Sequence, residues 1–381
     1  MMQLGTVEQK ELLRRGFSRR NFGRFATMLA AGATLPFSSE SALAQLSMVK
    51  NMPADAVKIN ANENPLGPCP EAAEAMHNII QKGGRYLYEE TFTMQETLAE
   101  MEGLKPSYIT PYAGSSAPLH QAVLAFTSPT KPFVTGDPGY EAGERAAEFI
   151  GSKVIRVPLT KTYAHDVVAM AKASPNAGLI YICNPNNPTG TLTSREDIDY
   201  IVANKPAGSI LLLDEAYIHI SGAPMASDLV AADKDVIILR TFSKIYGMAG
   251  LRAGAALGRP DLLKKIMPYS AGALPVTAMV GATASLKVKD LVPKRRKIIA
   301  DTREDVFAYL TKNNFKFVPS VSNKFMVDTG RPGREIIAAM QKEHVYIGRV
   351  WPSWPTYVRV TVGTPEEMAK FKIAFSKVMA A

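Results

Sequence analysis

Five short apolar runs that alternate with helix-length segments limit the fold of this 381-residue chain more than any other feature. The runs are almost continuously hydrophobic, as expected for strands that are buried on both faces of a parallel sheet. They cover residues 132–135, 153–157, 178–183, 209–213 and 236–240. Helix-length segments, such as residues 140–151 and 194–203, separate them. The alternation predicts an α/β domain built on a doubly wound, mostly parallel sheet.

The pattern changes after about residue 272, where the helices become longer. Predicted helices cover residues 278–287, 292–313 and 333–343, and predicted strands cover residues 315–318, 324–327, 345–347 and 357–362. This order is typical of a smaller α+β domain. We therefore expect four parts, which are a leader over residues 1–44, an N-terminal arm over 45–85, a large domain over 86–275 and a small domain over 276–381.

The composition is that of an ordinary globular protein. The chain is 46% hydrophobic and 21% charged, and no apolar run approaches the roughly 20 residues of a membrane-spanning helix. The net charge of +9 is scattered along the chain, which argues against a nucleic-acid partner. The two cysteines, Cys69 and Cys183, cannot form a disulfide framework and lack the spacing of a metal site, so we expect no metal.

The first 44 residues follow the order of a signal peptide. The run SRRNF at residues 18–22 precedes the mildly apolar, uncharged residues 25–37, and an A-x-A site ends at Ala44. The paired arginines resemble the twin-arginine export signal. We therefore expect recognition by the twin-arginine machinery, cleavage after Ala44 and a periplasmic protein without a membrane span. The alternative is an amphipathic N-terminal helix, which Gly32 and Pro36 would interrupt.

Polar side chains follow three of the predicted strands directly. Asn187 lies in the turn after the strand at residues 178–183. Asp214 and Tyr217 follow the next strand, and Lys244 follows the one after that. Because the carboxyl ends of parallel strands meet at one edge of a sheet, we expect these groups to converge on one cleft.

An amide, a carboxylate, a phenol and an amine in one cleft suit an aromatic aldehyde cofactor that is held as a Schiff base. A carboxylate keeps a pyridine nitrogen protonated, so that the ring withdraws electrons. Lys244 would supply the amine and, once the substrate displaces it, the base for proton transfer. Ser243 and Arg252, with the turn that ends at Ser115 and Ser116, are candidates to hold a phosphate group.

The motifs around these residues resemble the fold-type-I pyridoxal-phosphate aminotransferases of classes I and II. They are NPTG at residues 187–190, DEAY at 214–217, SK at 243–244 and LRAG at 251–254. Three further runs resemble the histidinol-phosphate aminotransferase branch, namely NANENPLGP at residues 60–68, RY at 85–86 and YVRVTVGT at 357–364. The resemblance spans residues 58–367 and implies pyridoxal phosphate as the cofactor.

The resemblance also implies a role for each matching residue around the cofactor. Lys244 would form the Schiff base and Asp214 would pair with the pyridine nitrogen. Asn187 and Tyr217 would hydrogen-bond the phenolic oxygen of the cofactor. Tyr140 would stack on the ring, although it also suits an ordinary position at a helix start. The cofactor phosphate would be bound by Ser115, Ser116, Ser243 and Arg252.

Other matching residues concern the substrate and a second subunit. Arg359 would grip the substrate α-carboxylate, for which the guanidinium fork is suited. Asn323 matches a small-domain residue near the substrate, although a cap at a strand end is the alternative. Tyr86 would reach the cofactor phosphate of a neighbouring subunit, which implies a homodimer with shared active sites.

The sequence departs from the histidinol-phosphate branch in two runs. It reads YLYEE at residues 86–90, where the family usually carries Tyr-Pro-Asp, and GSSAP at 114–118, where acidic residues are usual. Arg349 falls where the family places an arginine for a distal phosphate, and a distal carboxylate is the alternative ligand. Trp351 and Trp354 stand beside it, either for a bulky or aromatic substrate side chain or to pack a loop.

These features favour an aminotransferase that exchanges an amino group between an L-amino acid and a 2-oxo acid by a ping-pong mechanism. A decarboxylase or lyase of the same fold, similar to the threonine-phosphate decarboxylases, is the alternative that product analysis would distinguish. A non-catalytic interaction protein is a third interpretation. A dinucleotide oxidoreductase is disfavoured because no G-x-G-x-x-G follows the first strand.

Overall fold

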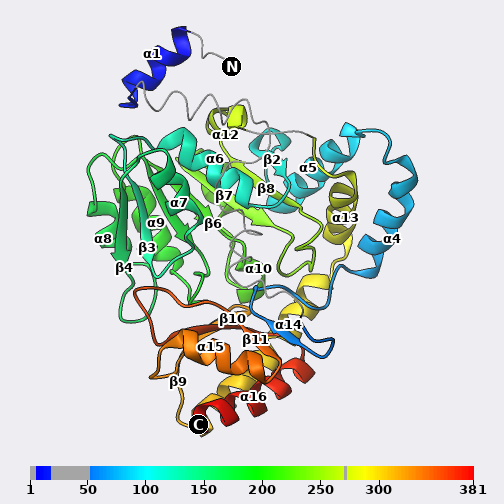
Figure 1. The fold of residues 1–381 in the computed structure, drawn as a ribbon. Helices are drawn as coiled ribbons and strands as arrows, with labels where there is room; N and C mark the ends of the chain where they lie inside the picture. Colours follow the sequence, from blue (N-terminus) through cyan, green and yellow to red (C-terminus); the bar gives the residue numbers. More distant parts are fainter. Residues whose placement is uncertain (1–5, 19–51, 270–272) are drawn as a thin grey trace.

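A seven-stranded sheet forms the centre of the large part of the molecule (Figure 1). The computed structural model describes residues 6–18, 52–269 and 273–381. The strand order in the sheet is β2-β8-β7-β6-β5-β3-β4. In chain order the strands are β2 (Ile109–Tyr112), β3 (Phe133–Asp137), β4 (Val154–Pro158), β5 (Leu179–Cys183), β6 (Ile210–Asp214), β7 (Val236–Thr241) and β8 (Gly254–Gly258).

The five strands from β3 to β7 are parallel, and β8 runs antiparallel to both β7 and β2. Every residue of β5, β6 and β7 is buried, as their continuous apolar runs predict. The expectation of a doubly wound, mostly parallel α/β sheet is confirmed. The crossing and flanking helices of this part are α4 (Pro70–Ile79), α5 (Tyr88–Glu102), α6 (Ser116–Phe126), α7 (Ala142–Phe149), α8 (Val167–Lys172), α9 (Arg195–Asn204), α10 (Ile218–Ser221), α11 (Ser227–Ala231), α12 (Pro260–Ile266) and α13 (Val276–Lys287).

A smaller α+β part carries the C-terminus and lies below the large sheet in Figure 1. Its antiparallel sheet has the order β12-β10-β9, and a separate parallel pair joins β1 to β11. The strands are β1 (Val57–Ile59), β9 (Lys316–Val318), β10 (Lys324–Asp328), β11 (Val345–Ile347) and β12 (Tyr357–Thr361). The helices are α14 (Leu291–Lys312), α15 (Gly333–Lys342) and α16 (Pro365–Ala380).

Two elements cross the boundaries that we expected between the arm, the large domain and the small domain. Strand β1 lies in the expected arm, yet it pairs with β11 of the small part. Helix α13 lies in the expected small domain, yet it packs against α4 and α5. The N-terminal arm therefore contributes to both parts, which matters for the site described below.

A short helix, α1 (Thr6–Arg14), lies within the expected leader and ahead of its arginine pair. Phe17 is buried, and the Arg15 guanidinium donates hydrogen bonds to the carbonyls of Leu124 (2.6 Å) and Thr127 (3.0 Å) at the end of α6. The arginine pair, the apolar run and the predicted cleavage site lie in residues 19–51, outside the described residues. Within the described part of the chain, no helix is both long enough and apolar enough to cross a membrane.

Candidate active site

The carboxyl ends of β5, β6 and β7 bring three of the predicted residues together. Asp214 is the last residue of β6, and it is in register with Cys183 of β5 and Leu239 of β7. Asn187 lies in the loop after β5, and Lys244 lies in the loop after β7. All three side chains are buried, with at most 4% of the residue exposed. The convergence expected from the strand order is therefore present in the structure.

Asp214 is held as a buried hydrogen-bond acceptor. The Tyr181 hydroxyl donates to Oδ2 over 2.8 Å, and the backbone N–H of Ala216 donates to Oδ1 over 3.1 Å. Burial, together with the Asp214 charge, raises the pKa of Tyr181 well above its usual value, so this phenol stays a donor. Hydrogen bonds to the charged form favour an ionised carboxylate, which is the state that pairs with a protonated pyridine nitrogen.

Two asparagines of the N-terminal arm connect the large part to the small one. The Asn62 amide donates to the Tyr217 hydroxyl (3.3 Å) and to Asn187 Oδ1 (3.5 Å). Arg359 of β12 donates to the same Asn187 oxygen (3.1 Å) and to the backbone carbonyl of Asn60 (2.7 Å). These bonds fix the guanidinium of Arg359, the phenol of Tyr217 and the amide of Asn187 relative to one another.

The predicted phosphate residues gather around the start of α6. Ser115 is the N-cap residue of this helix, and Ser116 is its first residue. The Arg252 guanidinium donates to Ser243 Oγ over 3.3 Å and also contacts the chain next to Gly114. Gly114 has a φ of +89°, which favours glycine, and a Cβ atom there would meet the Arg252 guanidinium. A helix N-terminus with two hydroxyls and a guanidinium forms a suitable cradle for a phosphate group.

Arg349 is already paired with an acidic side chain. Its Nη2 atom lies 3.0 Å from Glu141 Oε2, and both side chains are largely buried. Glu141 directly follows Tyr140, which is itself buried in the loop between β3 and α7. The positive charge that was expected to meet a distal phosphate or carboxylate is therefore offset by a carboxylate from the chain itself.

The indole of Trp351 lies close to both Arg349 and Arg359. The Arg349 and Arg359 guanidinium carbons lie 4.7 Å and 5.5 Å from the centre of the indole. Its Nε1 donates to the Gly139 carbonyl over 2.8 Å, and its ring packs with Val318 and Met326. The indole thus joins the small part to the loop that carries Tyr140, and the guanidinium groups of Arg349 and Arg359 lie over its ring.

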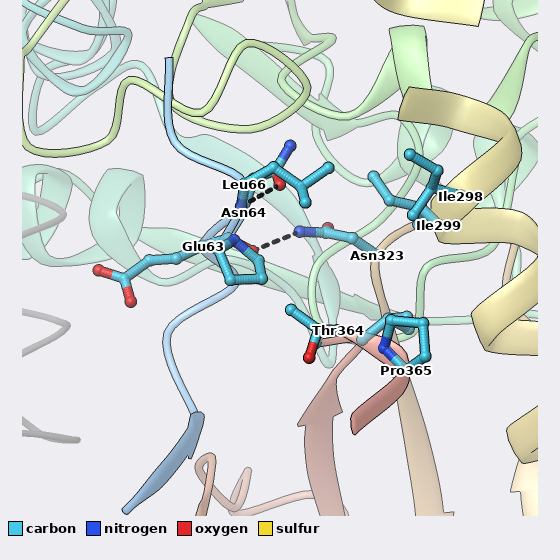
Figure 2. A pocket seen from close by; sticks show the side chains of 11 residues that line it. Glu63, Asn64, Leu66, Ile298, Ile299, Asn323, Thr364 and Pro365 are labelled. Carbon is cyan, nitrogen blue, oxygen red and sulfur yellow. Dashed lines mark hydrogen bonds between the residues drawn. The ribbon is translucent and has the colours of Figure 1, made fainter. Parts of the chain in front are cut away.

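Asn323 contacts the backbone of the N-terminal arm, as Figure 2 shows. Its amide donates to the carbonyls of Asn62 (3.4 Å) and Glu63 (3.3 Å). It lines a small pocket together with Leu66, Ile298 and Thr364. The side chain therefore supports the arm, and the prediction that it contacts the substrate stays a prediction.

Tyr86 lies apart from the buried cluster. It is 71% exposed and stacks on Tyr88, with ring centres 5.6 Å apart. Within the described residues it reaches none of the cofactor residues of its own chain. This position leaves the expected contact with a second subunit as a proposal.

Three buried residues of the site were not singled out from the sequence as site residues. Asn60 and Asn62 belong to the NANENP run, whose position in an arm gave no sign that they meet β12. Lys324 is fully buried in β10, and its Nζ lies 3.1 Å from the centre of the Tyr217 ring. A lysine inside an apolar strand run is the signal that would have revealed it, because a buried lysine is rare without a role.

Comparison with known proteins agrees with this geometry. The family model for aminotransferase class I and II matches residues 54–372. The chain belongs to this family, and it is an aminotransferase that depends on pyridoxal phosphate.

Its relatives carry names from the same family. A histidinol-phosphate aminotransferase of Moorella thermoacetica is 32% identical over 337 residues, which cover 86% of each chain. An aromatic amino acid aminotransferase of Cutibacterium acnes is 32% identical over 321 residues, or 82% of this chain and 90% of the relative. The crystal structure of histidinol-phosphate aminotransferase from Sinorhizobium meliloti in complex with pyridoxal-5'-phosphate superposes with a TM-score of 0.80. It is 25% identical, and the match covers 95% of this chain and 99% of the other.

The residues present fit pyridoxal phosphate. When bound, this cofactor supplies an aldehyde for a covalent link to an amine and a pyridine ring that takes up electrons. Lys244 would provide the amine, Asp214 the carboxylate for the ring nitrogen and Tyr217 the phenol, and all three residues are buried. The turn at Gly114 brings the Arg252 guanidinium close to the start of α6, where both would bind the phosphate group.

Proposed function

We propose that this aminotransferase exchanges the amino group of an L-α-amino acid with a 2-oxo acid, and that its substrates carry an uncharged or aromatic side chain. The proposal rests on the contrast between two arginines. Arg359 donates hydrogen bonds to two neutral oxygens, the Asn60 carbonyl and Asn187 Oδ1, whereas Arg349 is paired with the carboxylate of Glu141. A guanidinium that is held by neutral acceptors retains its charge for a substrate carboxylate.

The proton transfer is assigned to Lys244. Its amine is buried and lies 5.5 Å from the centre of the Tyr217 ring, on the side of the site where Asp214 ends β6. Its amine would hold the cofactor and, when free, would be the base that takes the α-proton of the substrate. Burial excludes water from this step and strengthens the charge interactions inside the cleft.

The histidinol-phosphate aminotransferase name of several relatives suggests a phosphorylated substrate as the second candidate. One observation weighs against it, because Glu141 places a negative charge beside the arginine that would meet a distal phosphate. A dianionic phosphate next to this carboxylate would be repelled unless Arg349 leaves its partner.

The first experiment is a spectroscopic test of the purified protein with its cofactor. The visible absorption of the bound cofactor is recorded before and after the addition of single L-amino acids and, separately, of histidinol phosphate, an amine that carries a phosphate ester in place of the carboxylate. Bleaching by phenylalanine or tyrosine at low concentration, with the matching 2-oxo acid as product, supports the proposal. Bleaching by histidinol phosphate alone supports the second candidate, and release of carbon dioxide indicates a decarboxylase.

We also propose a homodimer with shared active sites. The support is an exposed aromatic and aliphatic surface on the N-terminal elements, formed by Tyr86, Tyr88, Phe92 and Ile80, which are each at least 58% exposed. An apolar surface of this kind is typical of a protein interface. Sedimentation of the wild type and of Tyr88→Glu tests this, since the proposal requires that only the wild type sediments as a dimer.

Export to the periplasm is proposed from the sequence pattern of residues 18–44. Because histidine biosynthesis is a cytoplasmic process, such a location would favour amino-acid salvage or the modification of exported metabolites. Cell fractionation of the wild type and of a variant with both Arg19→Lys and Arg20→Lys tests the export route. Retention of the variant in the cytoplasm supports the twin-arginine signal, and an equal distribution of both proteins contradicts it.

A further inference from the structure

Lys324 is a second buried lysine in the catalytic centre. None of its surface is exposed, and its Nζ lies over the face of the Tyr217 ring, 3.1 Å from the ring centre. Its only polar contact within the described residues is with Ser322 Oγ, at 3.0 Å. A buried lysine whose amine contacts only a hydroxyl and a ring face lacks the ionic partner that a buried lysine normally has.

Lys324 of β10 and Arg359 of β12 lie on the same face of the small sheet. Lys324 is in register with Thr361, and Met326 with Arg359, on the antiparallel strands β10 and β12. Residues that are directly opposite share a face, and alternate residues on one strand share it too. Lys324 and Arg359 are thus diagonal neighbours on one face, a spacing of roughly 7–8 Å that two long side chains can bridge.

This face is directed at the catalytic centre of the large part. Thr361 hydrogen-bonds Asn62, whose amide contacts Tyr217, and Lys324 covers the ring of that tyrosine. The charged or titratable groups that act on Lys324 are Cys183, Asp214, Lys244 and Arg359. Only Asp214 among them is an ordinary anion, and its two oxygens already accept hydrogen bonds from Tyr181 and Ala216.

The charges around Lys324 therefore favour the binding of an anion. Burial lowers the pKa of Lys324 well below its usual value, and the cations Arg359 and Lys244 lower it further. An anionic ligand between Lys324 and Arg359 would offset both cations and restore the favourable charged form of the lysine. The cofactor phosphate is assigned to a different group of residues, Ser243 and Arg252, and neither of them is among the charged groups that act on Lys324.

We propose that Lys324 is a second binding residue for the substrate carboxylate that Arg359 receives, so that the site selects amines with an anionic group on the α-carbon over amines with a neutral one. This inference rests on the proposed function. Two side chains of the small-domain sheet would then bind the carboxylate. Arg359 would supply a planar guanidinium with two donors, and Lys324 a single positive charge.

The test uses the purified protein loaded with its cofactor and compares two ligands. One is the L-amino acid that bleaches the visible band of the wild type at the lowest concentration. The other is the amino alcohol with the same side chain, which lacks the carboxylate. For each ligand, the concentration that gives half of the spectral change is measured in the wild type, Lys324→Met and Lys324→Arg. This readout follows equilibrium binding and the first half-reaction and does not depend on turnover.

We expect Lys324→Met to raise the half-saturating concentration of the amino acid by about 10- to 100-fold, as for the loss of a charge-assisted hydrogen bond. The value for the amino alcohol should change by less than about threefold, and Lys324→Arg should recover most of the loss. Lys316→Met, on the exposed edge strand β9 of the same sheet, is the matched control and should change neither value.

Two outcomes would overturn the inference. The first is an equal shift of the half-saturating concentration for both ligands in Lys324→Met, which would indicate a structural role for the lysine. The second is no shift of this concentration for either ligand. If Lys324→Met does not hold the cofactor, Lys324→Gln replaces it with the same expectations, because the amide keeps the bond to Ser322. A wild type that no amino acid bleaches would instead refute the proposed function and leave this comparison without a reference ligand, so the two failures are distinguishable.

Discussion

Arg349 and Glu141 form a buried ion pair that joins the small part of the molecule to the loop behind Tyr140, with Nη2 and Oε2 3.0 Å apart. The pair links residues that are 208 positions apart in the chain. It places a carboxylate beside the guanidinium that the proposed function puts at the distal end of the site. On that proposal, the residue that follows the predicted cofactor-stacking tyrosine helps to set the specificity of the enzyme.

Replacement of Glu141 by Gln should turn the enzyme towards anionic side chains. The amide can still accept a hydrogen bond from Arg349, but it no longer offsets the guanidinium charge. We expect the ratio of kcat/KM for glutamate to that for phenylalanine to rise about tenfold. Glu148→Gln on the same helix removes an exposed partner of Arg156 and is the control. An unchanged ratio in Glu141→Gln would show that Arg349 does not reach the substrate.

Lys244→Ala should abolish turnover and keep part of the cofactor binding. The variant loses the amine for covalent attachment and proton transfer, while Asp214, Ser243 and Arg252 remain in place. Steady-state assays with the best amino donor measure the first effect, and equilibrium dialysis with pyridoxal phosphate measures the second. Turnover at the wild-type rate would be incompatible with the mechanism.

A buried charge triad beneath the site should dominate the response of stability to mutation. Arg240 pairs with Glu102 (2.7 Å) and with Glu215, and all three side chains are at most 3% exposed. Arg240→Met leaves two buried carboxylates without a cation, which should cost about 3–5 kcal/mol of the free energy of unfolding. Urea denaturation measures this. Arg195→Met breaks the exposed pair with Asp228 and should cost less than about 1 kcal/mol.

His120 should make the protein less stable in mild acid. Burial lowers the pKa of His120 to about 4, whereas the unfolded chain titrates near 6.5. The unfolded state therefore binds more protons between these values, and the free energy of unfolding falls as the pH falls through this window. From pH 7 to pH 5 the wild type should lose about 2 kcal/mol more than His120→Gln. Parallel urea curves for the two proteins at both pH values would contradict this assignment.

The sequence predicts the elements that carry continuous apolar runs and overlooks those that do not. Strands β3 to β7 lie within a residue or two of the expected ranges. Strands β2 and β8 were missed because ITPY contains a proline and GAALG consists largely of small residues, both of which disfavour a strand locally. Their pairing with each other and with β7 stabilises them, and such long-range contacts leave no local pattern.

The same division applies to the site. Lys244, Asp214 and Asn187 were found because each follows a strand in a recognisable run. The partner of Arg349 was not found, because Glu141 meets it only through folding. Lys324 was overlooked because strand periodicity assigns the residues around it to the hydrophobic core. The sequence does not show that Lys324 lies over the ring of Tyr217.

The contacts of Asn60 and Asn62 also bear on how the protein can be processed after synthesis. Both residues belong to a segment that begins at β1 and that ties Arg359 to Tyr217 and Asn187. A leader that is removed after Ala44 takes no part of this segment with it. A protease that cuts a few residues past Ile59 would separate Arg359 from the Asn60 carbonyl that accepts its hydrogen bond. Trimming that stops before β1 therefore leaves the contacts of both asparagines in place.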